Sequence, residues 1–171
     1  KAYPSWIYEV IMSVRKKFTE LLYNEMAINT DIIIIAGDLG WKQFDQHRLT
    51  YPDRFINVGA AEQLMVGAAV GMALEGKIPV VYSMTPFVIY RPFEFIRNHL
   101  ERDGVPVKLF GAGRNKDYDW LGWSHWAHDD KEHLSGFTNI TKLWPDNAED
   151  MEKIFKTVLY TPKPFYVNLS R

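Results

Sequence analysis

Cysteine is absent from the 171-residue sequence, and so is any excess of positive charge. Without cysteine, disulfide bonds, thiolate nucleophiles and cysteine metal sites are all excluded, and the fold must be stabilised by packing. The 20 Lys and Arg residues face 21 Asp and Glu, which leaves a formal net charge of −1. The sequence therefore argues against a DNA- or RNA-binding protein, because such proteins need positive charge to neutralise phosphates.

Long apolar runs are also missing. The longest purely aliphatic run covers residues 32–36, far short of the roughly 20 residues that a membrane helix needs. No positively charged leader precedes an apolar stretch, so we expect a soluble, cytoplasmic protein with no membrane partner. The residues are 47% apolar and 15% aromatic. That is enough for a core, and no linker or repeat divides it, so we expect one domain over residues 1–171.

Common signatures of phosphate and metal binding are missing too. Gly111-Ala-Gly113 lacks the third glycine of a dinucleotide-binding loop, and no Gly-Lys-Ser/Thr motif occurs. His125, His128 and His133 lie among acidic residues, but on one helix they do not supply the ligand number and closed geometry that zinc prefers. We predict no metal site in this chain, and a solvated polar helix start at that cluster.

Apolar periodicity divides the chain into alternating helices and strands. Amphipathic helices are predicted over the first 29 residues, with Pro4 in the first turn, and over residues 61–74, 92–102 and 147–160. Strands are predicted over residues 31–36, 55–58, 79–83, 105–110, 139–144 and 165–169. This order predicts an α/β fold with a doubly wound, mainly parallel sheet and helices on both faces.

Ligands bind such sheets outside the carboxyl ends of the strands. The loop of about twenty residues after Phe110 is long enough to indicate a function. Glu62 begins a predicted helix, where the helix dipole and a functional role explain an acidic residue equally well. Phe87 and Tyr90 lie in an aromatic stretch and are by default core or lid residues.

Three motifs follow one another along the chain: Gly37-Asp38-Leu39-Gly40, YPDRFINVGAAEQLMVG at residues 51–67, and GKIPVVYS at residues 76–83. Together they resemble the pyrimidine-binding domain of transketolase-like thiamine diphosphate enzymes. The resemblance covers nearly the whole chain, and several spaced motifs in the right order make it specific. It implies the pyrimidine domain of the thiamine diphosphate-binding fold.

The resemblance implies which residues contact the cofactor. Glu62 matches a glutamate that hydrogen-bonds N1′ of the aminopyrimidine. A carboxyl group that shares a proton with N1′ favours the imino tautomer, whose N4′ can remove the thiazolium C2 proton. Asp38, in the first motif, is expected to contact the cofactor. Met84, Phe87 and Tyr90 match the wall against the pyrimidine, with Phe87 as the stacking ring and Met84 in place of a phenylalanine.

The resemblance also implies substrate contacts. His125 matches a histidine that approaches the C1 hydroxyl and carbonyl of a donor sugar, where it polarises the substrate or moves protons. Arg171 matches an arginine that holds an acceptor phosphate. Leu121 replaces an acidic residue that contacts a donor hydroxyl, and Gly113 replaces a second histidine at the acceptor phosphate. These departures leave the donor stereochemistry and the mode of phosphate binding open.

Members of this family bind the diphosphate and Mg²⁺ on a separate domain with a Gly-Asp-Gly signature, which this sequence does not contain. The resemblance therefore implies a partner subunit that carries the diphosphate and Mg²⁺ site, in an α₂β₂ assembly. The chain alone is expected to be inactive. Aromatic loops around Tyr90, Trp120 and Trp126 are expected at the interface or the active site.

Three functions remain in view. The leading one is the pyrimidine-binding subunit of a split transketolase-like enzyme that transfers a two-carbon ketol unit between sugars or sugar derivatives. The second is a subunit of a 2-oxo acid decarboxylating enzyme, similar to deoxyxylulose phosphate synthase or the β subunit of 2-oxo acid dehydrogenases. The third is a non-catalytic scaffold subunit, which the presence of Glu62, Phe87 and His125 disfavours.

Overall fold

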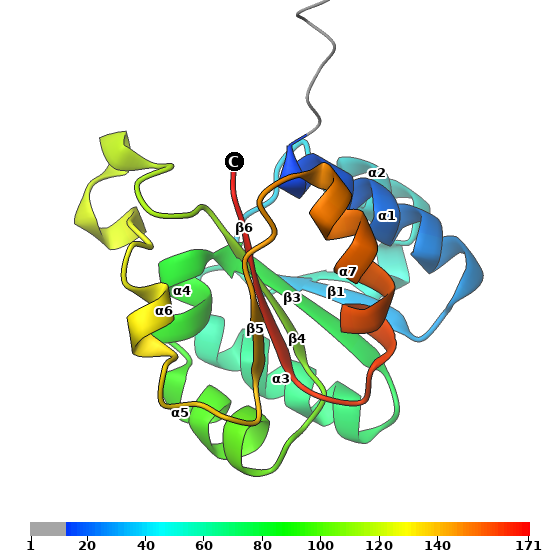
Figure 1. Cartoon of the computed structure of the whole chain (residues 1–171). Helices are drawn as coiled ribbons and strands as arrows, with labels where there is room; N and C mark the ends of the chain where they lie inside the picture. Colours follow the sequence, from blue (N-terminus) through cyan, green and yellow to red (C-terminus); the bar gives the residue numbers. More distant parts are fainter. Residues whose placement is uncertain (1–12) are drawn as a thin grey trace, which may run out of the picture.

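The computed structural model describes residues 13–171 and contains a six-stranded sheet whose neighbouring strands are all parallel (Figure 1). Its order is β2-β1-β3-β4-β6-β5. The strands are β1 (Ile32–Ala36), β2 (Phe55–Asn57), β3 (Ile78–Met84), β4 (Lys108–Ala112), β5 (Thr141–Leu143) and β6 (Phe165–Leu169). The predicted doubly wound parallel sheet is confirmed.

Helices cover both faces of this sheet (Figure 1). On one face, α1 (Val14–Ile28) and α7 (Ala148–Tyr160) pack on β-branched and aromatic side chains such as Ile34, Val80 and Phe110. On the other face lie α3 (Glu62–Leu74), α4 (Thr85–Tyr90), α5 (Phe93–Phe95) and the π-helix η3 (Ile96–Arg102). The central strands are therefore buried on both sides, which explains their continuous apolar runs.

Helix boundaries follow local chemistry. The Ser13 hydroxyl accepts a hydrogen bond from the Lys16 backbone at the start of α1, and Asn147 caps α7 in the same way through the Asp150 backbone. The earlier part of the predicted first helix, from Pro4 to Ile11, lies outside the described residues. No helix within residues 13–171 is both long and apolar enough to cross a membrane.

The sequence did not predict two α-helices of the described residues. α2 (Asp45–Thr50) and α4 occupy segments for which no helix or strand was predicted. In α4 a proline stands in the first turn, where its missing N–H costs no helical hydrogen bond. Because α4 starts directly after β3, it presents its side chains at the carboxyl edge of the sheet.

The chain reverses its direction across the sheet between β1 and β3, because β2 lies on one side of β1 and β4 to β6 extend the other side. In parallel sheets this reversal opens a crevice at the carboxyl ends of the strands. The loops that lead to α3 and α4 both start at this edge.

Candidate active site

Glu62 is the first residue of α3, and its side chain is only 4% exposed. The loop before it is held by Asn57, whose side-chain oxygen accepts hydrogen bonds from the backbone N–H groups of Asp38 (3.1 Å) and Gly59 (2.9 Å). Gly59 has a φ of 71°, a conformation that favours glycine. The predicted first and second motifs are thus joined, and Asp38 lies exposed at the end of β1.

The buried Glu62 carboxylate accepts a hydrogen bond from Arg91 Nη1 at 2.5 Å. The Arg91 guanidinium carbon also lies 3.6 Å from the centre of the Phe87 ring. Phe87 in turn contacts His125, with ring centroids 5.0 Å apart and planes at 66°. The structure therefore brings three predicted site residues, Glu62, Phe87 and His125, around one arginine that no sequence motif had marked.

His125 lies in the short 3-10 turn η5 (Trp123–His125), and its Nδ1 is 3.0 Å from the Ser124 hydroxyl. Partial burial lowers the pKa of His125, and the positive charge of Arg91 lowers it further. A neutral imidazole at neutral pH can accept a proton at one ring nitrogen and donate one from the other. This is the chemistry that a proton-moving residue needs.

Met84 and Tyr90 stand at the two ends of α4, and each makes further contacts. Met84 ends β3 and is 3% exposed, in the core on the α1 and α7 face of the sheet. Tyr90 turns toward α6 (Asp130–His133), where its ring lies 4.4 Å from that of His133. Burial, together with the carboxylate of Asp129, raises the pKa of the Tyr90 hydroxyl. Of the three residues of the predicted wall, Phe87 is the one whose ring is seen against both Arg91 and His125.

Residues 113–129 form an arm that projects beyond the carboxyl edge of the sheet (Figure 1). Gly113, at its base, has a φ of 91°, and a Cβ there would lie 2.6 Å from the Tyr118 ring. A histidine therefore does not fit at Gly113, which explains this departure from the family pattern. Leu121 is 45% exposed on the arm, in η4 (Asp119–Leu121).

Arg171 lies against the arm. Its backbone N–H donates to the Asp117 carboxylate, and its guanidinium lies over the rings of Tyr118 and Trp120, at 5.9 and 4.8 Å. Arg15 of α1 donates a hydrogen bond to the Tyr118 hydroxyl. Two cationic side chains, distant in sequence, thus meet at one tyrosine.

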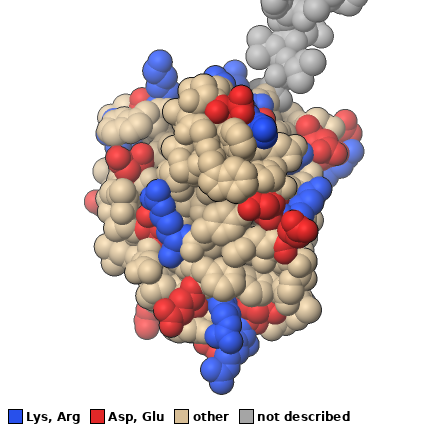
Figure 2. Space-filling model, turned by 90° about the vertical axis from the view of Figure 1, so that its left-hand side faces the viewer, with Lys and Arg blue, Asp and Glu red and all other residues tan. Residues whose placement is uncertain are grey.

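Figure 2 views the left-hand side of Figure 1 and shows Lys or Arg and Asp or Glu side chains interspersed with uncharged surface.

Arg114, the residue after Gly113, has a structural role. Its guanidinium donates to Asn168, to the Pro145 backbone and to the Asp146 carboxylate. It ties the base of the arm to the ends of β5 and β6.

The predicted solvated helix start at residues 125–133 is wrong for Asp130, which is 3% exposed. Its Oδ2 accepts hydrogen bonds from Trp144 Nε1 (2.8 Å), Tyr166 Oη (2.7 Å) and Asn168 Nδ2 (3.1 Å). Asn168 Nδ2 also donates to the Gly113 carbonyl and lies 3.2 Å from the Thr85 hydroxyl. We call Asp130, Tyr166 and Asn168 the buried polar cluster. No group of three or more metal-ligating side chains was found within residues 13–171.

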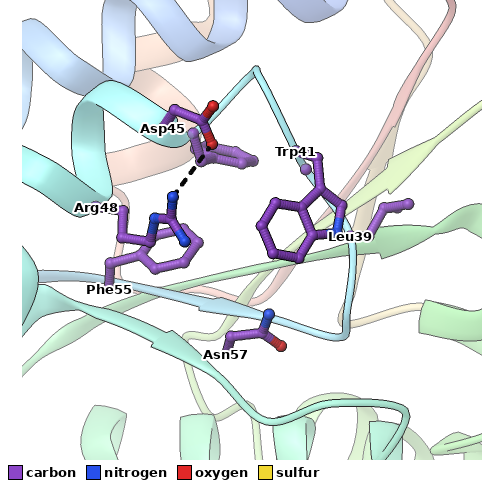
Figure 3. Close-up of a pocket in the computed structure, with 8 residues that line it drawn as sticks. Leu39, Trp41, Asp45, Arg48, Phe55 and Asn57 are labelled. Carbon is purple, nitrogen blue, oxygen red and sulfur yellow. Dashed lines mark ion pairs between the residues drawn. The ribbon is translucent and has the colours of Figure 1, made fainter.

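A separate pocket of about 160 Å³ opens at the carboxyl ends of β1 and β2 (Figure 3). Trp41 and Phe55 form part of its wall, and Asp45 and Arg48 pair across its rim at 3.8 Å. Its lining includes Asn57, which holds the Asp38 loop, but not Glu62, Phe87 or His125. The pocket is a neighbour of the Glu62 cluster rather than part of it.

Comparison with known proteins decides the family. Residues 11–171 match the family described as transketolase, pyrimidine binding domain. The chain belongs to this family. The resemblance stated from the sequence is confirmed.

Several relatives of this chain are named as transketolase subunits, and one solved neighbour is a split-gene transketolase. The chain is 35% identical over 119 residues to an apulose-4-phosphate transketolase subunit of Actinobacillus succinogenes, across 70% of this chain and 38% of that protein. A 6-deoxy-6-sulfo-D-fructose transketolase subunit of Clostridium is 27% identical over 92% of this chain and 49% of that one. A solved split-gene transketolase, an inactive β4 tetramer, matches with a TM-score of 0.81 and 27% identity, over 94% and 51% of the two chains. The chain thus spans about half or less of these relatives.

The geometry fits the aminopyrimidine of thiamine diphosphate. A flat group with a hydrogen-bonding edge can contact the Glu62 carboxylate and the face of Phe87 together, because the Arg91 guanidinium does both. Planarity and a hydrogen-bonding edge are also the properties of the aminopyrimidine.

Proposed function

We propose that the chain is the pyrimidine-binding part of a split transketolase-like enzyme that transfers a two-carbon ketol unit between sugars or sugar derivatives. The observation that carries this proposal is the convergence of a buried carboxylate, Glu62, with Phe87 and His125 at the carboxyl edge of the sheet. The names of the transketolase subunits that the chain resembles support it.

In this proposal each side chain has one task. Glu62 shares a proton with N1′ of the aminopyrimidine, and its burial keeps water from competing for that hydrogen bond. Phe87 stacks on the ring, Met84 and Tyr90 enclose it, and Asp38 contacts the cofactor from the neighbouring loop. Thiamine diphosphate, when bound, supplies the carbanion chemistry of ketol transfer.

The proposal assigns the substrate to the arm. His125 is partly buried beside Phe87 and has a lowered pKa, so it can exchange protons with a sugar hydroxyl or carbonyl at neutral pH. Arg171 holds an anionic end of the sugar, such as a phosphate, and the neighbouring Arg15 adds positive charge at Tyr118.

A partner subunit completes the site in this proposal. The diphosphate and Mg²⁺ are assigned to a chain with the diphosphate-binding domain, in an α₂β₂ assembly in the cytoplasm. The relatives named as subunits of split transketolases support such a partner.

The test is an activity assay on the native complex purified through this chain. With thiamine diphosphate and Mg²⁺, we expect turnover of a ketose donor with an aldose acceptor and no release of carbon dioxide from pyruvate. Carbon dioxide release without ketose turnover would instead show a 2-oxo acid decarboxylating enzyme.

Matched variants on one helix separate catalysis from folding. Glu62→Gln should lower kcat by about 100-fold or more, because the amide cannot exchange the proton with N1′. Glu75→Gln makes the same chemical change at an exposed position next to the end of α3 and should leave kcat unchanged. Full activity of Glu62→Gln would contradict the proposal and favour a scaffold subunit.

A further inference from the structure

Arg91 occupies both surfaces that the cofactor ring is proposed to use. One guanidinium donates to the Glu62 carboxylate at 2.5 Å and lies 3.6 Å from the centre of the Phe87 ring. A guanidinium is flat, donates hydrogen bonds in its plane and stacks on aromatic faces. It therefore satisfies the carboxylate and the ring in the same way as a flat heterocycle with a hydrogen-bonding edge.

The two partners of this ion pair differ in exposure. Glu62 is 4% exposed and begins a helix that is packed on the sheet, whereas the Arg91 side chain is 45% exposed. A buried carboxylate needs a partner, because an unpaired buried charge is costly. A half-exposed arginine can return its charged end to water at little cost. In the Arg91–Glu62 ion pair, the arginine side chain can therefore move into solvent while the carboxylate remains buried.

We propose that Arg91 holds the place of the aminopyrimidine in the cofactor-free chain and is displaced from Glu62 and Phe87 when the cofactor binds. This inference rests on the proposed function and adds a competing group within the chain itself. Arg91 keeps the Glu62 carboxylate paired in the absence of cofactor. It also weakens cofactor binding by the free energy needed to break its contacts with Glu62 and Phe87.

The contact also places Arg91 near His125, because both side chains lie against Phe87. The charge of Arg91 is one of the two causes of the lowered pKa of His125, after partial burial. Movement of the guanidinium away from Phe87 should therefore change the pKa of His125, the residue proposed to exchange protons with the substrate.

The test measures affinity rather than activity. Thiamine diphosphate with Mg²⁺ is titrated by calorimetry into the native complex that contains wild-type chain, Arg91→Gln, Arg91→Lys or Arg97→Gln. Arg97 is the matched control: it is exposed, it is also a cation of the segment that follows β3, and it hydrogen-bonds Asn98 instead of Glu62.

We expect Arg91→Gln to bind the cofactor about five- to tenfold more tightly, because the contact that must be broken is gone and a half-exposed ion pair is worth about one factor of ten or less. Arg97→Gln should bind as the wild type does. Arg91→Lys keeps the charge but not the flat guanidinium that stacks on Phe87, so its affinity should lie between those of the wild type and Arg91→Gln. This variant guards against a glutamine variant that folds poorly.

Equal or weaker binding by Arg91→Gln would overturn the placeholder, because the arginine would then not compete with the cofactor. The two proposals fail differently. If neither wild type nor Arg91→Gln binds thiamine diphosphate, the proposed function is wrong. If both bind it with the same affinity, the proposed function stands and the role of Arg91 is wrong.

Discussion

Within residues 13–171, two buried carboxylates lie near the carboxyl edge of the sheet, and they are satisfied in opposite ways. Glu62, 4% exposed, is paired with Arg91, a side chain that is itself 45% exposed. Asp130, 3% exposed, accepts hydrogen bonds from three side chains, two of which, Tyr166 and Asn168, are completely buried. A carboxylate with one exchangeable partner can bind a ligand, whereas a carboxylate with fixed donors can only hold structure.

The fixed carboxylate supports the exchangeable one. Through Asn168, the buried polar cluster contacts the Gly113 carbonyl at the base of the arm and the Thr85 hydroxyl at the start of α4. The arm carries His125, and α4 carries Phe87. The two carboxylates therefore have different roles: Asp130 positions the elements, and Glu62 is proposed to contact the ligand.

The largest expected effect on stability comes from removing the fixed carboxylate. Asp130→Ala leaves the Trp144, Tyr166 and Asn168 donors without their shared acceptor, and we expect the free energy of unfolding to fall by about 4 kcal/mol. Urea denaturation measures this change. Glu132→Ala, exposed on the same helix, is the control and should have little effect. A loss below about 1 kcal/mol for Asp130→Ala would remove the contrast between the two carboxylates.

A slightly smaller loss in the free energy of unfolding is expected at acid pH, because of His47. Burial lowers the pKa of His47 from 6.5 to about 4, so the folded chain keeps it neutral where the unfolded chain takes up a proton. Stability from this residue is complete above pH 6.5 and is lost as the pH falls toward 4, by about 3 kcal/mol. Urea denaturation between pH 4 and 7 measures it. His47→Gln should flatten that part of the profile, and an unchanged profile would exclude His47 as its cause.

The exchangeable carboxylate should matter little for stability. Glu62→Gln keeps an oxygen that accepts the Arg91 hydrogen bond, so we expect the free energy of unfolding to change by less than about 1 kcal/mol. The same urea experiment, at neutral pH, measures it. A loss as large as that of Asp130→Ala would show that Glu62 is a structural group as well, and the comparison would fail.

The smallest effect is expected on the arm. Trp123 is 69% exposed, so Trp123→Ala should change the free energy of unfolding by less than about 0.5 kcal/mol. Its contacts with Trp126 and His128 stay on the surface of the arm. A thermal denaturation scan checks this expectation. A large drop in Tm would show that the arm is part of the core.

The sequence predicted the exchangeable carboxylate better than the fixed one. Glu62 lies in a contiguous motif at a helix start, so the family resemblance marked it, although the local pattern alone left its role open. The donors to Asp130 come from residues 14 to 38 positions away in sequence, and no local pattern encodes such contacts. Charged residues are also rarely buried, so a solvated helix start was the natural but wrong expectation for Asp130.

The difference between local pattern and contacts distant in sequence also explains what else the sequence did and did not predict. Strands β1 and β3 were predicted because their β-branched runs report burial directly, while α4 was missed because a short proline-containing aromatic segment has no helical period. Arg91 was visible in the sequence, but its role depends on a contact with Glu62, 29 residues earlier. The replacement at Gly113 became intelligible only when the Tyr118 ring was found against it.

The most direct test of the account is a calorimetric titration of thiamine diphosphate with Mg²⁺ into this chain alone and into its native complex. The account predicts no measurable binding to the chain alone and clear binding to the complex, because Glu62 and Phe87 are proposed to hold only the pyrimidine and a partner is proposed to hold the diphosphate. Tight binding by the chain alone would contradict it.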